Sequence, residues 1–336
     1  MNYVRSVLCA LLVAVVVTAF VGAFEARACS VCMAGDPYFD ANGATAQQVG
    51  NLSAYLEVRG WKKESGLLPH DEGEHAEGEE PEGEEEHEER EENESQRLDL
   101  YLSYTPIDRL TLTVDIPVKF NEVTEINGDV SEKFSIDGLG DISFAATGVV
   151  WRNRDVLPST WVEARVVVKT PTGKSNKRVN GIQDPHLQAG TGSWDTGLGA
   201  AMAHKLEWAS LYTSFLYKIN TKGSLDYEYG DAVLANVAID IPVGHAIKVP
   251  ALDWLGFITQ LNYRWADKDQ SENVNFNDSG GSILYISPGV KITLPWFRDQ
   301  QPPVLRVSTQ VPVTSSWLNG QQHEDPVWAA GVLMRF

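Results

Sequence analysis

The sequence has few cysteines, few basic residues and, after its first residues, no long apolar run. Its three cysteines in 336 residues are consistent with export and indicate little else. Its 27 Lys and Arg, against 46 Asp and Glu, form no basic patch with interleaved aromatics, which argues against nucleic-acid binding. After Phe24 no segment has the uninterrupted apolar length of a membrane helix. If the chain spans a bilayer, it must therefore do so as a closed β-barrel.

The first residues have the pattern of a secretory signal peptide. Arg5 precedes an apolar stretch from Val7 to Phe24, and Ala26-Arg27-Ala28 matches the small-x-small cleavage pattern. We expect residues 1–28 to be removed, so that the mature chain begins at Cys29. The alternative is an uncleaved membrane anchor, because the apolar stretch approaches bilayer-spanning length.

Residues 29–48 are expected to form a periplasmic N-terminal segment that carries a C-x-x-C motif. Met33 stands where c-type haem attachment would need a histidine. A disulfide between Cys29 and Cys32 is the expected state in an oxidising compartment. A thiol metal or redox site is the alternative, although no βαβ pattern surrounds the pair. No cofactor is expected.

Period-two alternation, the pattern of half-buried strands, recurs along nearly the whole remaining chain. In "RLDLYLSY", Leu98, Leu100 and Leu102 share one face, while Asp99 and Ser103 lie on the other. Most of the predicted strands are ten residues or longer, as a tilted bilayer crossing requires. Twelve strands are predicted, at residues 50–62, 96–106, 109–122, 139–152, 160–170, 193–205, 209–220, 230–243, 254–266, 282–295, 304–315 and 326–336.

The connections between these strands alternate between short turns and longer polar loops. That alternation is typical of bacterial outer-membrane barrels, with short turns in the periplasm and long loops outside. Tryptophans lie near both sets of connections and at no strand centre, as in aromatic girdles. They are Trp151, Trp161, Trp208, Trp254 and Trp296 near the turns, and Trp61, Trp194, Trp265, Trp317 and Trp328 near the loops.

The fold class predicted for residues 49–336 is all-β, a transmembrane antiparallel up-and-down barrel of about twelve strands. The last strand, "AAGVLMRF", resembles the terminal strand of bacterial outer-membrane proteins. In those proteins the assembly machinery reads the closing aromatic residue, here Phe336. The predicted location is the outer membrane of a Gram-negative bacterium, with membrane lipid, the barrel-assembly machinery and a small-molecule solute as partners.

With the apolar faces outward, fifteen charged side chains should point into the barrel. Nine are basic and six acidic, so the interior is mixed and slightly positive. Two interpretations remain open: the charges pair across strands and fill a nearly closed barrel, or they line a solute path that modestly favours anions. The residues are Glu57, Arg59, Arg97, Asp99, Asp115, Lys119, Asp141, Glu163, Arg165, Lys169, Lys218, Asp240, Arg264, Lys291 and Arg306.

An acidic block occupies the first expected external loop, residues 63–95. From Asp71 to Glu94 it carries fifteen acidic residues and one arginine, which leaves only −5 of the formal net charge of −19 for the other residues. Such a composition predicts disorder. Two hypotheses remain open: a solvated, repulsive segment, or a weak divalent-cation site at His70, His75 and His87 with the surrounding glutamates.

A lipid-hydrolysing barrel would need a nucleophile, a base and a third group that orients the base. His204 and His245 are expected at the periplasmic ends, and His186 and His323 in external loops without a paired serine motif. The chain is therefore not expected to be an enzyme.

Glycine-rich motifs at three strand ends carry a family resemblance. They are Gly-Leu-Gly-Asp at 138–141, Pro-Thr-Gly at 171–173 and Gly-Thr-Gly-Ser-Trp-Asp at 190–195. From Asp137 onward the chain resembles the MetA-pathway phenol-degradation family of outer-membrane transporters. The resemblance implies passage of small, hydrophobic or aromatic compounds across the outer membrane. The acidic loop and the N-terminal cysteine pair depart from the family pattern.

Overall fold

The computed structural model describes residues 49–63, 89–127, 130–178, 185, 187–272, 274–276, 279–294, 301–314 and 325–336. No helix within these ranges is long and apolar enough to cross a membrane. The elements are β1 (Leu52–Lys63), β2 (Glu89–Ile107), β3 (Leu110–Asn127), β4 (Val130–Leu139), β5 (Ser143–Arg152), β6 (Thr160–Lys169), β7 (Asp195–Lys205), β8 (Ser210–Ile219), η2 (Ser224–Asp226), β9 (Tyr227–Glu228), β10 (Ala232–Pro242), α3 (Val243–Ile247), η3 (Pro250–Leu252), β11 (Leu255–Ala266), β12 (Gln270–Ser271), β13 (Val274–Asn275), β14 (Gly281–Thr293), β15 (Val304–Thr314) and β16 (Val327–Arg335).

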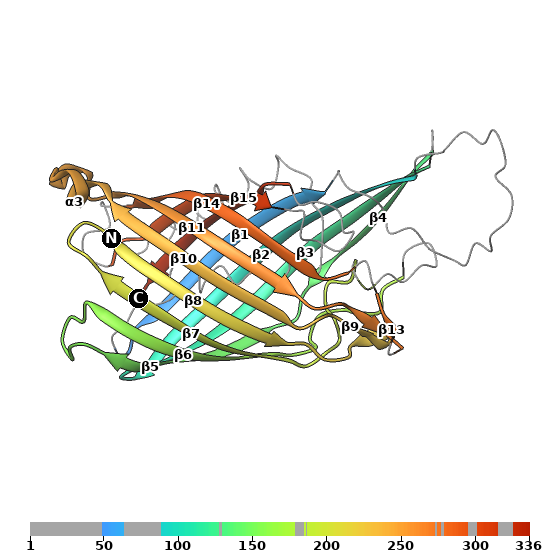
Figure 1. The fold of residues 1–336 in the computed structure, drawn as a ribbon, viewed down its shortest axis with the longest axis horizontal. Helices are drawn as coiled ribbons and strands as arrows, with labels where there is room; N and C mark the ends of the chain where they lie inside the picture. Colours follow the sequence, from blue (N-terminus) through green and yellow to red (C-terminus); the bar gives the residue numbers. More distant parts are fainter. Residues whose placement is uncertain are drawn as a thin grey trace, which may run out of the picture.

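The long strands close into one antiparallel barrel (Figure 1). Each strand pairs with its sequence neighbours, and β1 pairs with β16, for example Tyr55 with Leu333, to close the sheet. Both β4 and β5 pair with β3: β5 pairs with the first half of β3, and β4 pairs with the second half. Together β4 and β5 therefore occupy a single strand position in the barrel. The result is a closed barrel of twelve strands, as the alternation predicts.

The burial pattern of the barrel is the reverse of that in a water-soluble protein. Large apolar side chains at mid-strand point outward, with Leu198 55% and Val237 52% exposed, while the neighbouring polar residue Asn236 is buried inside. A contiguous apolar outer band is stable only against lipid. The chain is therefore an outer-membrane β-barrel whose polar side chains line the interior.

The two ends of the barrel differ. At one end, here called the turn end, short connections join β2 to β3 and β7 to β8, and the chain finishes at Phe336, whose amide donates to the Leu52 carbonyl (2.8 Å). At the other, the loop end, β4, β9 and β13 project beyond the barrel (Figure 1). Because short turns face the periplasm in outer-membrane barrels, the loop end faces the cell exterior.

Two segments predicted as loops contain strand. β2 begins at Glu89, inside the expected loop 63–95, and the expected loop from Val123 to Gly138 is a hairpin of β3 and β4. Backbone pairing joins Glu89 to Asn127 and Phe134 to Val123. Strand pairing runs through backbone hydrogen bonds, so it continues past the apolar band, where side-chain alternation no longer marks it.

Smaller elements occupy other connections. β9, β12 and β13 form a three-stranded sheet at the loop end, where Tyr227 stacks on Phe276 with ring centroids 5.8 Å apart. The turn from β10 to β11 contains α3 and η3. These short elements lack the long alternating pattern that predicts the barrel strands.

The tryptophans follow the predicted girdles only in part. Trp151, Trp208 and Trp194 are exposed on the outer surface near the strand ends. Trp61 and Trp161 are buried inside the barrel instead, where the Trp161 indole N–H donates to Glu163 Oε1 at 3.1 Å. These two lie at positions in register with inward-facing residues, so strand alternation overrides the interfacial preference of the indole ring.

Candidate solute path inside the barrel

A cavity opens in the half of the barrel nearest the loop end. Its volume is about 150 Å³, room for on the order of ten water molecules. Basic and acidic side chains line it: Arg97, Lys119, Arg165, Lys169 and Lys218, with Asp115, Asp141, Asp195 and Asp269. Apolar residues from β6, β8, β10 and β11 form a different part of its wall: Val167, Leu216, Ala232 and Ala266.

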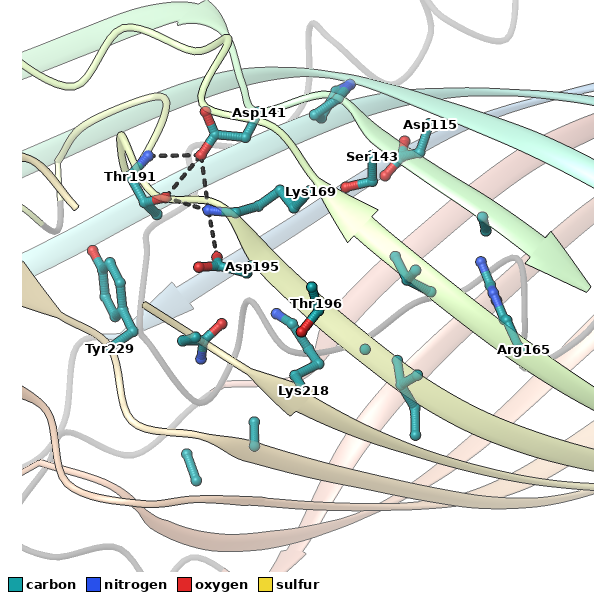
Figure 2. Close-up of a pocket in the computed structure, with 18 of the residues that line it drawn as sticks. Asp115, Asp141, Ser143, Arg165, Lys169, Thr191, Asp195, Thr196, Lys218 and Tyr229 are labelled. Carbon is teal, nitrogen blue, oxygen red and sulfur yellow. Dashed lines mark hydrogen bonds and ion pairs between the residues drawn. The ribbon is translucent and has the colours of Figure 1, made fainter. Parts of the chain in front are cut away.

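A cluster around Lys169, here called the lysine knot, closes one side of the cavity. The knot comprises Lys169, Asp141, Thr191, Ser193 and Asp195. Figure 2 shows the Lys169 amino group between the two carboxylates, with Nζ 3.0 Å from Asp141 Oδ2 and 2.6 Å from Asp195 Oδ2. The same amino group donates to the Thr191 hydroxyl and to Ser193 Oγ (3.1 Å). The knot therefore places one cation between two buried carboxylates and satisfies their hydrogen bonds internally.

Asp141 also ties two loop segments to the barrel wall. It accepts hydrogen bonds from the backbone amides of Gly173 (2.9 Å) and Thr191 (2.8 Å) and from the Thr191 hydroxyl (2.9 Å). The three glycine-rich motifs, far apart in the sequence, thus meet at one point. A carboxylate that accepts several such bonds fixes the course of the loop from β6 to β7.

Close backbone contact explains the glycines of these motifs. A Cβ placed on Gly173 would lie 2.7 Å from the Gly190 Cα, and one on Gly190 would lie 2.6 Å from the Gly173 carbonyl carbon. Both distances are below any contact that a real Cβ makes, and the neighbouring atoms are backbone. Only glycine at both positions lets the two segments cross beside Asp141.

The loop from β6 to β7 also packs on the β3–β4 hairpin. Leu187 forms an apolar cluster with Val123, Phe134 and Ile136. Asn121 Nδ2 donates to the Leu187 carbonyl at 3.1 Å. The described part of this loop around Leu187 therefore lies against the β3–β4 hairpin, on the side of the lysine knot.

A chain of ion pairs covers the inner face of β1, β2 and β3. Arg59 lies 3.2 Å from Glu57 and 3.4 Å from Asp99, and Arg97 lies 2.5 Å from Asp99 and 3.1 Å from Asp115. Charges of alternating sign pair across strands here, as expected where charged side chains fill the barrel and do not line an open path. This wall is closed by paired charges.

Neutral polar residues cover the opposite inner face. Asn262 links Asn236 (2.9 Å) and Ser287 (2.5 Å), and Asn236 donates to Ser214 (3.0 Å), so one row of hydrogen bonds crosses β8, β10, β11 and β14. Nearer the loop end, Arg264 donates to Gln310 (2.7 Å) on β15. The interior therefore combines this polar row and the apolar wall of the cavity with charges that are concentrated on β1, β2, β3 and β6.

The structure divides the fifteen predicted interior charges into two groups. All are buried or half-buried on the inner face. Seven lie on the cavity wall, and the others fill the remaining interior, such as the Asp240 carboxylate, which pairs with Lys291. The cavity group is Arg97, Lys119, Asp115, Asp141, Arg165, Lys169 and Lys218; the other group is Glu57, Arg59, Asp99, Glu163, Asp240, Arg264, Lys291 and Arg306.

Several cavity residues were not predicted from the sequence. Asp195 is the first residue of β7, in register with the small inward residues Gly197 and Ala201, so alternation could have identified it. Asp269 and Tyr229 come from loops, where no periodic pattern reports on side-chain direction. Asp269 accepts from the Tyr227 hydroxyl (2.7 Å) and the Gly230 amide (2.8 Å), which holds both loops over the cavity.

The other predicted sites lie outside the described residues or do not line this cavity. The signal peptide, Cys29, Cys32, His70, His75 and His87 lie outside the described residues, so their roles stay predictions. Within the described ranges no cluster of three metal-binding side chains occurs. His204 contacts the Thr160 hydroxyl (2.8 Å) near the turn end, and His245 lies in α3, 3.7 Å from Asp253.

Comparison of the sequence with protein-family models and with curated proteins gives no match. Among solved structures, the fold is similar to that of the COG4313 outer membrane channel from Pseudomonas putida F1. That structure aligns with a TM-score of 0.60 and 16% identity over 90% of this chain and 99% of the other. Two further structures are less similar. The translocator domain of the autotransporter NalP from Neisseria meningitidis aligns with a TM-score of 0.43 and 11% identity over 88% of this chain and 91% of the other. The CymD monoaromatic hydrocarbon channel aligns with a TM-score of 0.42 and 9% identity over 86% of this chain and 89% of the other. The chain has the fold of an outer-membrane β-barrel.

Proposed function

We propose that this barrel is a channel for the passive passage of small solutes across the outer membrane. The cavity in the half of the barrel nearest the loop end, lined by charged and apolar side chains, carries the proposal. A barrel that served only as a scaffold would gain stability from filling this space, because empty volume costs packing energy. Twelve strands leave room for a narrow path rather than a wide pore.

The resemblance of the strand-end motifs to the MetA-pathway phenol-degradation family extends the proposal to small hydrophobic or aromatic solutes. The apolar wall of Val167, Leu216, Ala232 and Ala266 supports it, since such a surface offers contact to a carbon skeleton. The ring of Tyr229 at the loop end adds an aromatic surface to the cavity wall (Figure 2).

Planar-bilayer recording of the refolded protein tests the proposal. We expect steady single-channel conductance that persists when residues 70–95 are deleted, because the cavity is built from other parts of the chain. The conductance should be small, as a narrow path requires. A barrel that is silent in both forms would refute passive passage.

A further inference from the structure

Lys119 is a buried lysine on the cavity wall, and within the described ranges no counter-charge lies at contact distance from its amino group. It is 6% exposed and lies on β3. Its amino group makes no hydrogen bond and no ion pair with any residue within the described ranges, although it reaches the cavity. Removing a charge from water without a partner is costly. A ligand of opposite charge would offset that cost.

Four carboxylates in the same part of the barrel as Lys119 are already engaged with other cations. Asp141 and Asp195 bind Lys169, while Asp99 and Asp115 bind Arg97. Arg97 also stands directly opposite Lys119 in the pairing of β2 with β3, so two cations occupy adjacent positions. A like charge directly opposite disfavours the charged form of Lys119, and an anion bound beside the lysine would offset that repulsion.

The position of Lys119 is fixed by its surroundings. A Cβ placed on Gly140 would lie 3.4 Å from the Lys119 Cε and 3.1 Å from Pro117, so the lysine stem passes close over Gly140, beside the lysine knot. The stem packs on the backbone while the ammonium group reaches the cavity, an arrangement usual for long cationic side chains. The charge is thus held at one place on the wall.

We propose that Lys119 binds the carboxylate of a small amphipathic anion whose carbon skeleton lies against Val167, Leu216 and Ala232. The inference deepens the proposed function, on which it rests, by naming the chemical class of the solute. A charge-assisted hydrogen bond to Lys119 supplies binding free energy at one end of the ligand, and apolar contact supplies it at the other.

Equilibrium binding in detergent micelles tests the site without requiring conductance. The probe is para-fluorobenzoate, followed by fluorine NMR line broadening, and the neutral control ligand is para-fluorobenzyl alcohol. We expect the acid to bind the full-length protein about tenfold more tightly than the alcohol, since one charged hydrogen bond distinguishes them. Equal binding of the two ligands by the unaltered protein would overturn the proposal.

Two lysine variants complete the test. Lys119→Gln should weaken binding of the acid about tenfold and leave binding of the alcohol unchanged. Lys133→Gln removes the same charge from the exposed hairpin and should bind the acid normally. Unchanged acid binding in Lys119→Gln refutes the site. If the barrel does not conduct but binds the acid in a Lys119-dependent way, the channel proposal is refuted and the binding site stands. If the barrel conducts but acid binding does not depend on Lys119, the binding site is refuted and the channel proposal stands.

Discussion

Replacing Lys169 with methionine is expected to lower the free energy of unfolding by about 3 kcal/mol. The substitution keeps the length of the side chain but leaves Asp141 and Asp195, whose side chains are 5% and 6% exposed, without their shared cation. Urea unfolding of the refolded barrel measures the loss. Trypsin gives a local readout, because Lys174, Lys177 and Arg178 lie in the loop that the knot holds and should be cleaved faster.

Two controls separate the knot from a general effect of removing a lysine. Lys222→Met breaks an exposed ion pair with Asp226 (3.6 Å), so it should change stability by less than about 1 kcal/mol. Adding Asp141→Asn and Asp195→Asn to Lys169→Met should recover much of the lost stability, because no unpaired charge then remains. If Lys169→Met is as stable as the unaltered protein, the knot does not hold the loop.

A charge placed on the lipid face is expected to cause the second large loss of stability. Val237 lies at the middle of β10, points outward and is 52% exposed. Val237→Arg is expected to lower the free energy of unfolding in lipid vesicles by about 2–4 kcal/mol. The cost arises because the guanidinium group would lie in hydrocarbon, where no water can solvate it.

Val274 provides a matched control for this substitution. It is 67% exposed on β13, in the small sheet that projects beyond the barrel at the loop end. The same change, Val274→Arg, should have little effect on stability because the new side chain reaches water. Equal losses at both positions would contradict the assignment of the apolar band to the bilayer.

The barrel could be predicted from the sequence because its strands repeat one physical pattern. Lipid outside and a polar interior force alternation along every crossing, so Leu98, Leu100 and Leu102 identify a strand and its facing together. The pattern stops where the membrane stops. The start of β2 at Glu89 could not be predicted because its composition indicates disorder. The β3–β4 hairpin could not be predicted because its buried side chains, such as Phe134, contact Leu187 of a distant loop rather than lipid.

The site could be predicted only as far as side-chain direction. Alternation places Lys119 and Lys169 on the inner face. It does not indicate that Lys169 binds two carboxylates while Lys119 contacts none among the residues that the structure describes. Which carboxylates a wall lysine binds depends on which loop residues pack against the barrel wall. Asp141 meets Thr191 through the crossing of Gly173 and Gly190, a long-range contact with no periodic signal. The glycine-rich motifs marked the place without showing that they meet.

Cysteine accessibility during planar-bilayer recording tests most directly whether the cavity is the solute path. Ala232→Cys puts a thiol on the cavity wall, and Ala235→Cys puts one on the outer face of the same strand, both in a background with Cys9, Cys29 and Cys32 replaced by serine. A charged methanethiosulfonate reagent should reduce the current through the Ala232→Cys channel and leave the Ala235→Cys channel unchanged. A current that the reagent leaves unaltered in both would show that ions do not pass through this cavity.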